Sequence, residues 1–246
     1  MNTGLKDGLG QSDNEVLIRL VAKCNNYVLG FYSMGFRTYL FDLDGTLVDH
    51  FQAIHRSYVF TMNRLGLPKP TMEQVRSAVG GGLERAFSKL IPTQYHQEGL
   101  TIYREYWDKT MLDDVVLLPG ALSLLEKLHA RGATLGVCTN KHGPSARRIC
   151  EHLSIARYMN VVVGAGDTPW LKPAAQMTSH TLNLLGSSTK AAVLIGDSPF
   201  DVQAAHNGGI VSWCVTTGTH NLAELKEAGA DAIYANFDEM ADDLGL

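Results

Sequence analysis

The chain has 246 residues, of which 45% are hydrophobic and 19% are charged, and its formal net charge is -4 at pH 7. These values are typical of a globular protein with one large core, or with a core and a smaller companion. The Lys and Arg residues form no runs, so the sequence offers no basic surface for nucleic acid or for an anionic membrane. We therefore expect a small molecule as the partner, and we leave monomer and homodimer open.

The first part of the chain contains an apolar stretch at residues 15–36. Arg19 and Lys23 interrupt it, so we expect no membrane helix, and the stretch lacks the basic start and the cleavage pattern of a signal peptide. Its apolar spacing fits one amphipathic helix over residues 17–28. In an alternative interpretation the natural protein starts at Met34, and what precedes is a mis-assigned start or a disordered extension.

The four cysteines show neither CxxC nor zinc-finger spacing; they are Cys24, Cys138, Cys150 and Cys214. Cys138 and Cys214 lie in apolar runs of the kind that form buried strands. This pattern indicates reduced, mostly buried thiols rather than disulfides or a metal site. Because such thiols are typical of a reducing compartment, we predict a cytoplasmic protein.

From residue 37 onward, short apolar runs alternate with helical periodicity, which is typical of βα units that build a parallel sheet. Most of these runs are apolar on both alternating faces, as expected for strands that helices cover on both sides. Pro119 and Gly132 mark the ends of one helix, and Pro173 and Gly186 those of another. We predict strands at residues 38–41, 133–138, 161–163, 191–195, 210–215 and 232–234.

One segment, from about residue 51 to residue 110, shows helical periodicity only. Its first helix has an apolar face formed by Ile54, Tyr58, Met62 and Leu65. Further helices are expected at residues 72–79, 83–90 and 94–109. The segment therefore interrupts the α/β pattern directly after the first strand.

This pattern predicts an α/β fold: a doubly wound, mainly parallel sheet with a Rossmann-like core and an inserted all-helical cap domain. We place an N-terminal extension at residues 1–33 and the α/β catalytic core at residues 34–49 and 119–246. The helical cap domain then covers residues 50–118.

Ligands of an open parallel sheet bind beyond the carboxyl ends of its strands, so the residues that follow each apolar run are the informative ones. In this chain they are polar throughout. We take as the candidate site Asp42, Asp44, Thr139, Asn140, Lys172, Asp197 and Asp201.

Asp42 and Asp44 stand two residues apart, so in an extended segment both carboxylates leave the same face. Two close carboxylates repel, and either one takes a proton or a cation neutralises them. Taken alone, Asp-Leu-Asp-Gly is also a common turn. The evidence for a site comes from its combination with the acids after the later strands.

With Asp197 and Asp201 the site has four carboxylates against one obvious lysine, an arrangement that a divalent cation compensates. Oxygen ligands without a His/Cys cluster favour Mg²⁺ over zinc. Lys172 and the Thr139 hydroxyl are then suited to hold a phosphate group. Singly, Thr139 and Asn140 are equally well explained as helix caps and Lys172 as a solvated loop charge; their joint occurrence at successive strand ends argues for a site.

Four segments stand in the order and approximate spacing of the haloacid dehalogenase superfamily signature. Phe-Asp-Leu-Asp-Gly-Thr-Leu-Val-Asp at residues 41–49 resembles its first motif, and Cys-Thr-Asn at residues 138–140 resembles its second. Lys172-Pro173 resembles the third motif, and Gly-Asp-Ser-Pro-Phe-Asp at residues 196–201 the fourth. The resemblance covers the chain from about Met34 to its end.

The resemblance implies a catalytic role for several of these residues. Asp42 is then the nucleophile that forms an aspartyl-phosphate, and Asp44 protonates the leaving oxygen and later activates the hydrolytic water. Thr139, Asn140 and Lys172 are expected to hold the phosphoryl group of the substrate.

The resemblance also implies a set of Mg²⁺ ligands. These are Asp42, the backbone carbonyl of Asp44, and Asp197. Asp201 is expected behind them, where it steadies Lys172 or a metal-bound water.

A helical cap inserted after the first motif is similar to a group that contains phosphoglycolate phosphatase, pyrophosphatase, β-phosphoglucomutase, phosphonoacetaldehyde hydrolase and dehalogenases. Asp44 argues against the dehalogenases, which lack this acid. Residues 80–84 contain neither the lysine of the phosphonoacetaldehyde hydrolases nor the Gly-Val-Ser-Arg stretch of the mutases. We predict a Mg²⁺-dependent phosphatase of a small phosphorylated metabolite, similar to phosphoglycolate phosphatase.

Other functions remain open at this point. Pyrophosphate, a sugar phosphate or a nucleotide is an alternative substrate, phosphoryl transfer by a phosphomutase is an alternative reaction, and a binding protein without turnover is an alternative class. Cap residues that can face the leaving group are Gly81, Gly82, Arg85 and Tyr106. Arg85 is suited to pair with a substrate carboxylate, or it lies on a solvated helix face. Tyr103 and Trp107 are expected in the cap core, and His142 outside the site.

Overall fold

The computed structural model of the protein describes residues 36–246, and Arg37–Leu246 form one unit. The predictions for residues 1–33, a start at Met34, and the thiol of Cys24 lie outside the described residues. The other three cysteines, Cys138, Cys150 and Cys214, are buried and free, as predicted.

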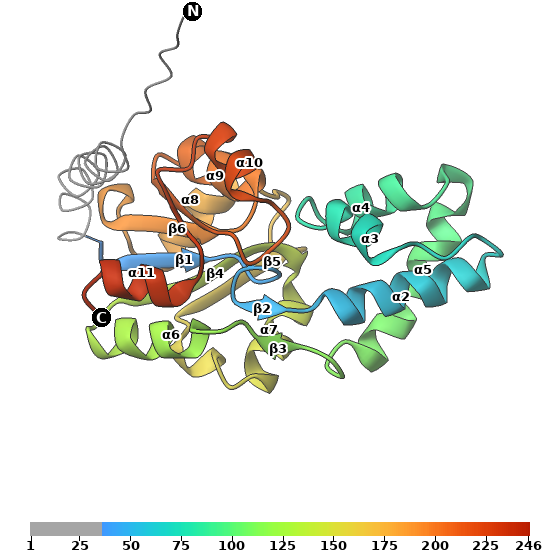
Figure 1. The fold of residues 1–246 in the computed structure, drawn as a ribbon, viewed down its shortest axis with the longest axis horizontal. Helices are drawn as coiled ribbons and strands as arrows, with labels where there is room; N and C mark the ends of the chain where they lie inside the picture. Colours follow the sequence, from blue (N-terminus) through green and yellow to red (C-terminus); the bar gives the residue numbers. More distant parts are fainter. Residues whose placement is uncertain (1–35) are drawn as a thin grey trace, which may run out of the picture. The chain divides into compact units, whose positions relative to one another are not determined.

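Six parallel strands form the central sheet, in the order β5-β4-β1-β6-β7-β8 (Figure 1). Numbered along the chain within this sheet, the order is 3-2-1-4-5-6, that of doubly wound nucleotide-binding folds, and it reverses between β1 and β6. The strands are β1 (Thr38–Phe41), β4 (Thr134–His142), β5 (Val161–Ala165), β6 (Ala192–Gly196), β7 (Val211–Val215) and β8 (Ala232–Tyr234).

Helices cover both faces of this sheet. In Figure 1, α8 (Ala175–Leu184), α9 (Pro199–Asn207) and α10 (Leu222–Glu227) lie above the sheet, and α6 (Ala121–Ala130) and α7 (Gly143–His152) lie below it. A last helix, α11 (Phe237–Asp243), packs against α6. Every residue of β1 and β6 is buried, which explains why these strands are apolar on both faces. The predicted fold class is therefore confirmed.

The predicted strand ends differ from the observed ones mainly at β4. The prediction ended this strand at Cys138, whereas β4 continues through Thr139 and Asn140 to His142. Its pairing with β5 shifts register between Cys138 and His142, and this irregularity allows polar residues to continue the strand. The second motif is therefore part of a strand and not of the loop after it.

Residues 51–110 contain helices and no strand, as predicted. The helices are α2 (Phe51–Arg64), α3 (Met72–Ala78), α4 (Leu83–Leu90), the short 3-10 helix η1 (Thr93–Tyr95) and α5 (His96–Thr110). Tyr58, Phe87 and Tyr103 form an aromatic cluster in their core, with ring centroids 5.0 to 5.5 Å apart. We call α2 to α5 the cap, because Figure 1 shows them beyond the carboxyl ends of the strands.

A short antiparallel ribbon joins the two connections between cap and core. It consists of β2 (Val48–Asp49) and β3 (Val116–Leu117), which lie between the sheet and the cap in Figure 1. We did not predict these strands, because two residues are too few to show an alternating pattern. The domain boundaries at residues 49/50 and 118/119 stay a prediction.

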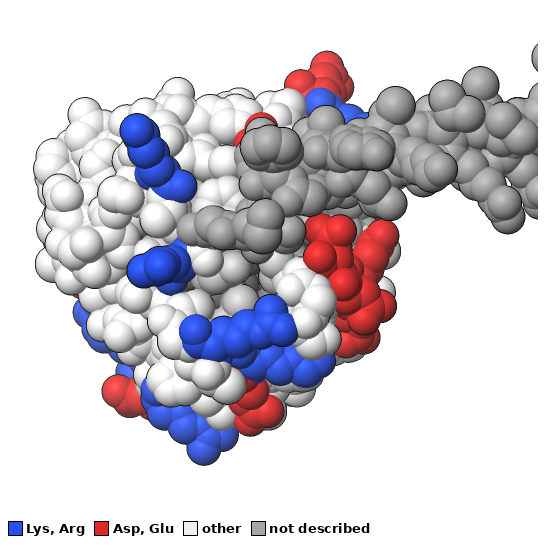
Figure 2. Space-filling model, turned by 90° about the vertical axis from the view of Figure 1, so that its left-hand side faces the viewer, with Lys and Arg blue, Asp and Glu red and all other residues white. Residues whose placement is uncertain are grey.

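The charges on the described surface are mixed. On the face that Figure 2 shows, Lys and Arg side chains lie in several separate places, with acidic side chains near some of them. That face therefore presents no continuous basic surface among the described residues. None of the helices within residues 36–246 has both the length and the apolar character that a membrane span requires.

Candidate active site

The structure brings the predicted site residues together at the carboxyl ends of β1, β4 and β6. Asp42 follows β1, Asp197 follows β6, and Asp201 lies in the first turn of α9. The chain order reverses between β1 and β6, so the connections that follow these two strands run to opposite sides of the sheet. A crevice opens between them at this edge. The site lies at the position that this topology favours for a ligand.

A buried lysine joins two of the carboxylates. The Nζ atom of Lys172 lies 2.9 Å from Oδ1 of Asp42 and 2.6 Å from Oδ1 of Asp201. Burial raises the pKa of Asp42 to about 6, against the lowering effect of Lys172. Burial also disfavours the charge of Lys172, but Asp201 and Asp42 outweigh it and raise the pKa of this lysine above its usual value. Lys172 is therefore a permanent cation beside Asp42.

Asp197 is fixed by donors from three directions. Thr46 Oγ1 donates to its Oδ1 at 3.0 Å, and the backbone N and the Oγ1 of Thr219 donate to its Oδ2 at 2.8 and 3.0 Å. A Cβ atom on Gly218 would lie 1.9 Å from Asp197 Oδ2, so a glycine is required there. Burial raises the pKa of Asp197 to about 7, and the neighbouring Asp201 adds to this effect.

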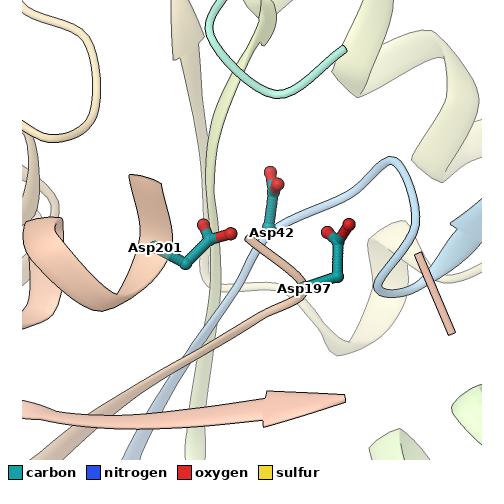
Figure 3. Close-up of side chains that lie close together, drawn as sticks. All are labelled: Asp42, Asp197 and Asp201. Carbon is teal, nitrogen blue, oxygen red and sulfur yellow. The ribbon is translucent and has the colours of Figure 1, made fainter. Parts of the chain in front are cut away.

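The carboxylates of Asp42, Asp197 and Asp201 fit a hard divalent cation. They offer one oxygen each, all within 4.8 Å of one another, and Figure 3 shows Asp42 and Asp197 side by side with Asp201 pointing toward them. Both oxygens of Asp201 are already engaged, one by Lys172 and the other by Ser198 N and Oγ at 3.1 and 2.6 Å. Lys172 already neutralises Asp201, whereas the donors to Asp197 are uncharged, so Asp42 and Asp197 are the better ligands. Burial raises the pKa of both carboxyls, an effect that a nearby cation would oppose. The same carboxylates with oxygen donors only suit Mg²⁺.

Asp44 lies apart from this group and is held by different partners. Lys141 Nζ donates to both of its oxygens, at 2.9 and 2.7 Å, and His50 Nδ1 lies 3.4 Å from its Oδ1. Burial alone would raise the pKa of Asp44, but Lys141 and His50 outweigh burial and hold it below its usual value. Its backbone carbonyl as a metal ligand stays a prediction.

Three residues around Asp44 were not predicted as site residues. Lys141 Nζ lies 4.6 Å from the ring centroid of Trp107 of the cap, and the rings of His50 and Trp107 are 4.9 Å apart. A signal for Lys141 was present in the sequence: it stands two residues after Thr139, so in a continued strand both side chains share a face. Nothing in the sequence signals His50, because its position depends on the fold of the cap.

The side chain of Asn140 is engaged by the protein itself. Its Nδ2 donates to the carbonyl oxygens of Lys172 and of Gly80 in the cap, both at 2.9 Å, and its Oδ1 accepts from Lys172 N at 2.7 Å. The amide therefore links β4, the Lys172 loop and the cap. Thr139 accepts from Lys141 N at 3.2 Å and hydrogen-bonds Asp42, where it lowers the carboxyl pKa.

A pocket of about 620 Å³ lies between the core and the cap. Core residues Asp42, Asp44, Thr139 and Asn140 line it. The residues that the cap contributes are mainly apolar or aromatic: Ile54, Tyr58, Val79, Leu83, Ala86, Tyr103 and Trp107. Tyr103 and Trp107, expected only in the cap core, thus serve both the core and the pocket. His142, which we placed outside the site, also lines it.

Most cap residues proposed to face the leaving group lie elsewhere. Of the four, only Gly82 lines the pocket. Arg85 is exposed, and its guanidinium lies over the ring of Phe200 at 5.1 Å. The ring of Tyr106 stacks on Phe60 at 4.0 Å. Of the two positions that we considered for Arg85, the structure shows the solvated helix face, because Arg85 is exposed and does not line the pocket.

The sheet order defines a doubly wound α/β fold, and its strand ends carry the acidic residues of the candidate site. The chain belongs to the haloacid dehalogenase-like hydrolase family, which matches residues 39–215. The predicted family is therefore confirmed.

Relatives with known names cover most of the chain. A phosphoglycolate phosphatase of Salmonella typhimurium is 30% identical, over 84% of this chain and 91% of the relative. A 5'-nucleotidase of Pseudomonas aeruginosa is 31% identical, over 76% of this chain and 86% of the relative. Among solved structures, a hydrolase of this family from Streptococcus pneumoniae superposes with a TM-score of 0.78 at 28% identity, covering 84% of this chain and 97% of that chain.

Proposed function

We propose that the protein is a Mg²⁺-dependent phosphatase that hydrolyses a small phosphate monoester through an aspartyl-phosphate on Asp42. The observation that carries this proposal is the contact between Asp42 and Lys172, which places a buried carboxylate beside a permanent cation at the floor of a ligand-sized pocket. The phosphatase class is supported by the family and by the phosphatase among the relatives.

The roles of the two residues at the floor follow from their geometry. Asp42 is the nucleophile: its carboxylate attacks phosphorus, and the bond from phosphorus to the ester oxygen breaks. Lys172 neutralises phosphoryl oxygens that approach Asp42, while Asp201 keeps its ammonium in place from behind. When bound between Asp42 and Asp197, Mg²⁺ supplies charge neutralisation for both the carboxylates and the phosphate.

Asp44 is the acid and base of the proposed reaction. In the free protein Lys141 keeps it ionised, so it is ready to accept a proton from the water that hydrolyses the aspartyl-phosphate. To protonate the leaving oxygen, Asp44 must itself be protonated first. A substrate that loosens the contact between Lys141 and Asp44 raises the carboxyl pKa and favours that state.

The physiological ester is the finer part of the proposal. The relatives named phosphoglycolate phosphatase favour 2-phosphoglycolate, and the relative named 5'-nucleotidase favours a nucleoside monophosphate. A binding protein without turnover has less support, because the two acids and the lysine that turnover needs all belong to this site. A mutase has less support, because residues 80–84 lack the Gly-Val-Ser-Arg stretch of the mutases.

The test is release of inorganic phosphate with Mg²⁺ across 2-phosphoglycolate, pyrophosphate, sugar phosphates and nucleoside monophosphates. We expect Asp42→Asn to lower kcat on the order of 10⁴-fold or more, because it removes the nucleophile while keeping the shape. Asp242→Asn, which changes an exposed acid of α11, is the matched control and should leave kcat unchanged. Activity that survives in the Asp42 variant, or that EDTA does not reduce, would contradict the proposal.

A further inference from the structure

We propose that the cap side of the pocket selects phosphate esters whose leaving group carries a flat, uncharged ring, in preference to a small carboxylate such as glycolate. This inference rests on the proposed phosphatase function, because it names the substrate class of the same site. In the reaction, the bond from phosphorus to the ester oxygen breaks, water supplies the new oxygen on phosphorus, and the ring-bearing alcohol leaves with the proton from Asp44.

The walls of the pocket opposite Asp42 are apolar and aromatic. α2 contributes Ile54 and Tyr58, α4 contributes Leu83, and α5 contributes Tyr103 and Trp107. The rings of Tyr103 and Trp107 are stacked, with centroids 5.9 Å apart and planes only 13° from parallel. Burial of a ring against such surfaces gains about 25 cal/mol for each Å² of apolar area removed from water.

The charges of the pocket disfavour an anionic leaving group. Among the described residues that line it, Lys141 is held by both oxygens of Asp44, and Arg104 is 3.2 Å from Glu84. Glu84 and Asp108 add two carboxylates to the same lining. A glycolate carboxylate would therefore meet acids, or would have to compete with Asp44 for the buried Lys141 or with Glu84 for the exposed Arg104.

Two further cations, Arg85 and Lys172, are not available to a carboxylate of the leaving group either. Arg85, for which the sequence left a contact with a substrate carboxylate open, lies over Phe200 and does not line the pocket. Lys172 lies between Asp42 and Asp201, where it serves the phosphoryl group. The far end of the pocket thus contains no lysine or arginine free of an acidic partner among the described lining residues.

The size of the pocket agrees with this chemistry. A volume of about 620 Å³ lies within the range of roughly 300–1,000 Å³ that holds drug-sized ligands. A two-carbon leaving group would leave the part of the wall that is open to the pocket, such as the half-buried Val79 and Leu83, in contact with water. A ring next to the phosphate group displaces that water and covers the wall.

Binding of stable analogues tests the inference apart from turnover. Titration calorimetry of the full chain with Mg²⁺ compares benzylphosphonate, the methylene analogue of phenyl phosphate, with phosphonoacetate. Phosphonoacetate carries the carboxylate of 2-phosphoglycolate one atom closer to phosphorus. We expect benzylphosphonate to bind at least about tenfold more tightly, a difference of about 1.4 kcal/mol. Equal binding, tighter binding of phosphonoacetate, or no binding of either would overturn the inference.

Two variants sharpen this measurement. Leu83→Arg places a cation in the pocket wall and should reverse the preference toward phosphonoacetate, whereas the control Leu83→Met should keep the wild-type order. Arg85→Ala should leave phosphonoacetate binding unchanged, and a tenfold loss there would restore the carboxylate role of Arg85 and overturn the inference. If Leu83→Arg fails to fold, the wild-type comparison and Arg85→Ala still decide the matter.

Turnover separates this inference from the proposed function. Phenyl phosphate, a nucleoside 5'-monophosphate and 2-phosphoglycolate are compared by kcat/KM, and the first two distinguish a plain ring from a ring on a sugar. Asp42-dependent hydrolysis with 2-phosphoglycolate preferred would keep the phosphatase and overturn the inference. Ring-selective binding without hydrolysis of any ester would keep the inference and overturn the phosphatase.

Discussion

The two ends of the pocket differ in chemistry: one is lined by charged side chains and the other mainly by apolar and aromatic ones. At the core end, three buried carboxylates converge within 4.8 Å of one another and face one lysine. At the cap end, aromatic and aliphatic side chains form the wall, and its lysine and arginine are already paired with acids. The core end has an excess of negative charge that a cation would balance. The lysine and arginine of the cap end are paired, and one hydroxyl of its wall, that of Tyr58, is buried without a hydrogen-bond partner.

This difference separates two tasks. A site that is short of positive charge gains free energy when a cation and a phosphate arrive together, so the core end is suited to chemistry. The cap end gains free energy when a ligand excludes water from its apolar wall or hydrogen-bonds the Tyr58 hydroxyl, so the cap end is suited to recognition. Changes at the core end should therefore alter turnover and stability, and changes at the cap end should alter substrate affinity.

The largest effect is expected from Lys172→Met, which keeps the volume of the side chain and removes its charge. Asp42 and Asp201 would then be buried without a cation, and loss of one partner of a buried ion pair typically costs about 3–5 kcal/mol. The midpoint of thermal unfolding, Tm, and kcat should both fall, and Mg²⁺ should restore part of the loss in Tm. Lys190→Met, at an exposed position, is the control. A variant as stable as the control would show that the core end is not short of positive charge.

A smaller effect is expected from pH and metal together. The pKa of Asp42 is raised to about 6 and that of Asp197 to about 7, from 3.8 for an ordinary aspartate. Between about pH 4 and pH 7 the folded metal-free protein therefore keeps protons that the unfolded chain has lost, so these two groups make it less stable as pH rises through this window. Mg²⁺ should oppose that loss near pH 8 and have little effect near pH 5.

The measurement is Tm against pH with EDTA and with Mg²⁺, for the wild type and for Asp197→Asn. A ligand at 100 times its Kd stabilises the folded state by about 2.7 kcal/mol, and 1 kcal/mol corresponds to roughly 2–4 °C in a chain of this size. We expect a metal-dependent shift of several degrees in the wild type and a much smaller one in the variant. The same shift in both proteins would place the cation outside Asp197.

The fold of the core was predictable because its signals are local. The strands β1 and β8 were predicted at their observed bounds, and the α/β alternation led to the correct sheet class. The residues of the core end follow from the same rule, since Asp42 and Asp197 come directly after apolar runs. The end of β4 was missed, because polar residues continue that strand through an irregular pairing.

The cap end was not predictable in the same way. Helix α4 was predicted at its observed bounds, yet which of its residues meet the substrate depends on its rotation against the core. Leu83 and Arg85 are both helical, and only the fold shows that the first lines the pocket and the second covers Phe200. His50 near Asp44 is a similar case, because the partner of its Nε2 is the carbonyl of Met111, 61 positions along the chain.

The smallest effect is expected from loss of a hydrogen bond between the cap and the core. Trp107 Nε1 of the cap donates to Ser145 Oγ of α7 at 3.2 Å, and both side chains are buried. Ser145→Ala removes this bond, and a typical hydrogen bond contributes about 0.5–1.5 kcal/mol. Because the bond holds the wall and not the reacting groups, KM for the preferred ester should rise by up to about tenfold, with kcat nearly unchanged.

The exposed Ser88→Ala in α4 is the control for this change, since its hydroxyl contacts only Glu84 O of its own helix. A fall in kcat by a hundredfold in Ser145→Ala, with KM unchanged, would mean that the cap positions reacting groups as well as substrate. The division between chemistry at the core end and recognition at the cap end would then fail. A rise in KM alone would place Trp107 on the recognition side, although it lies against Lys141 and therefore one contact away from Asp44.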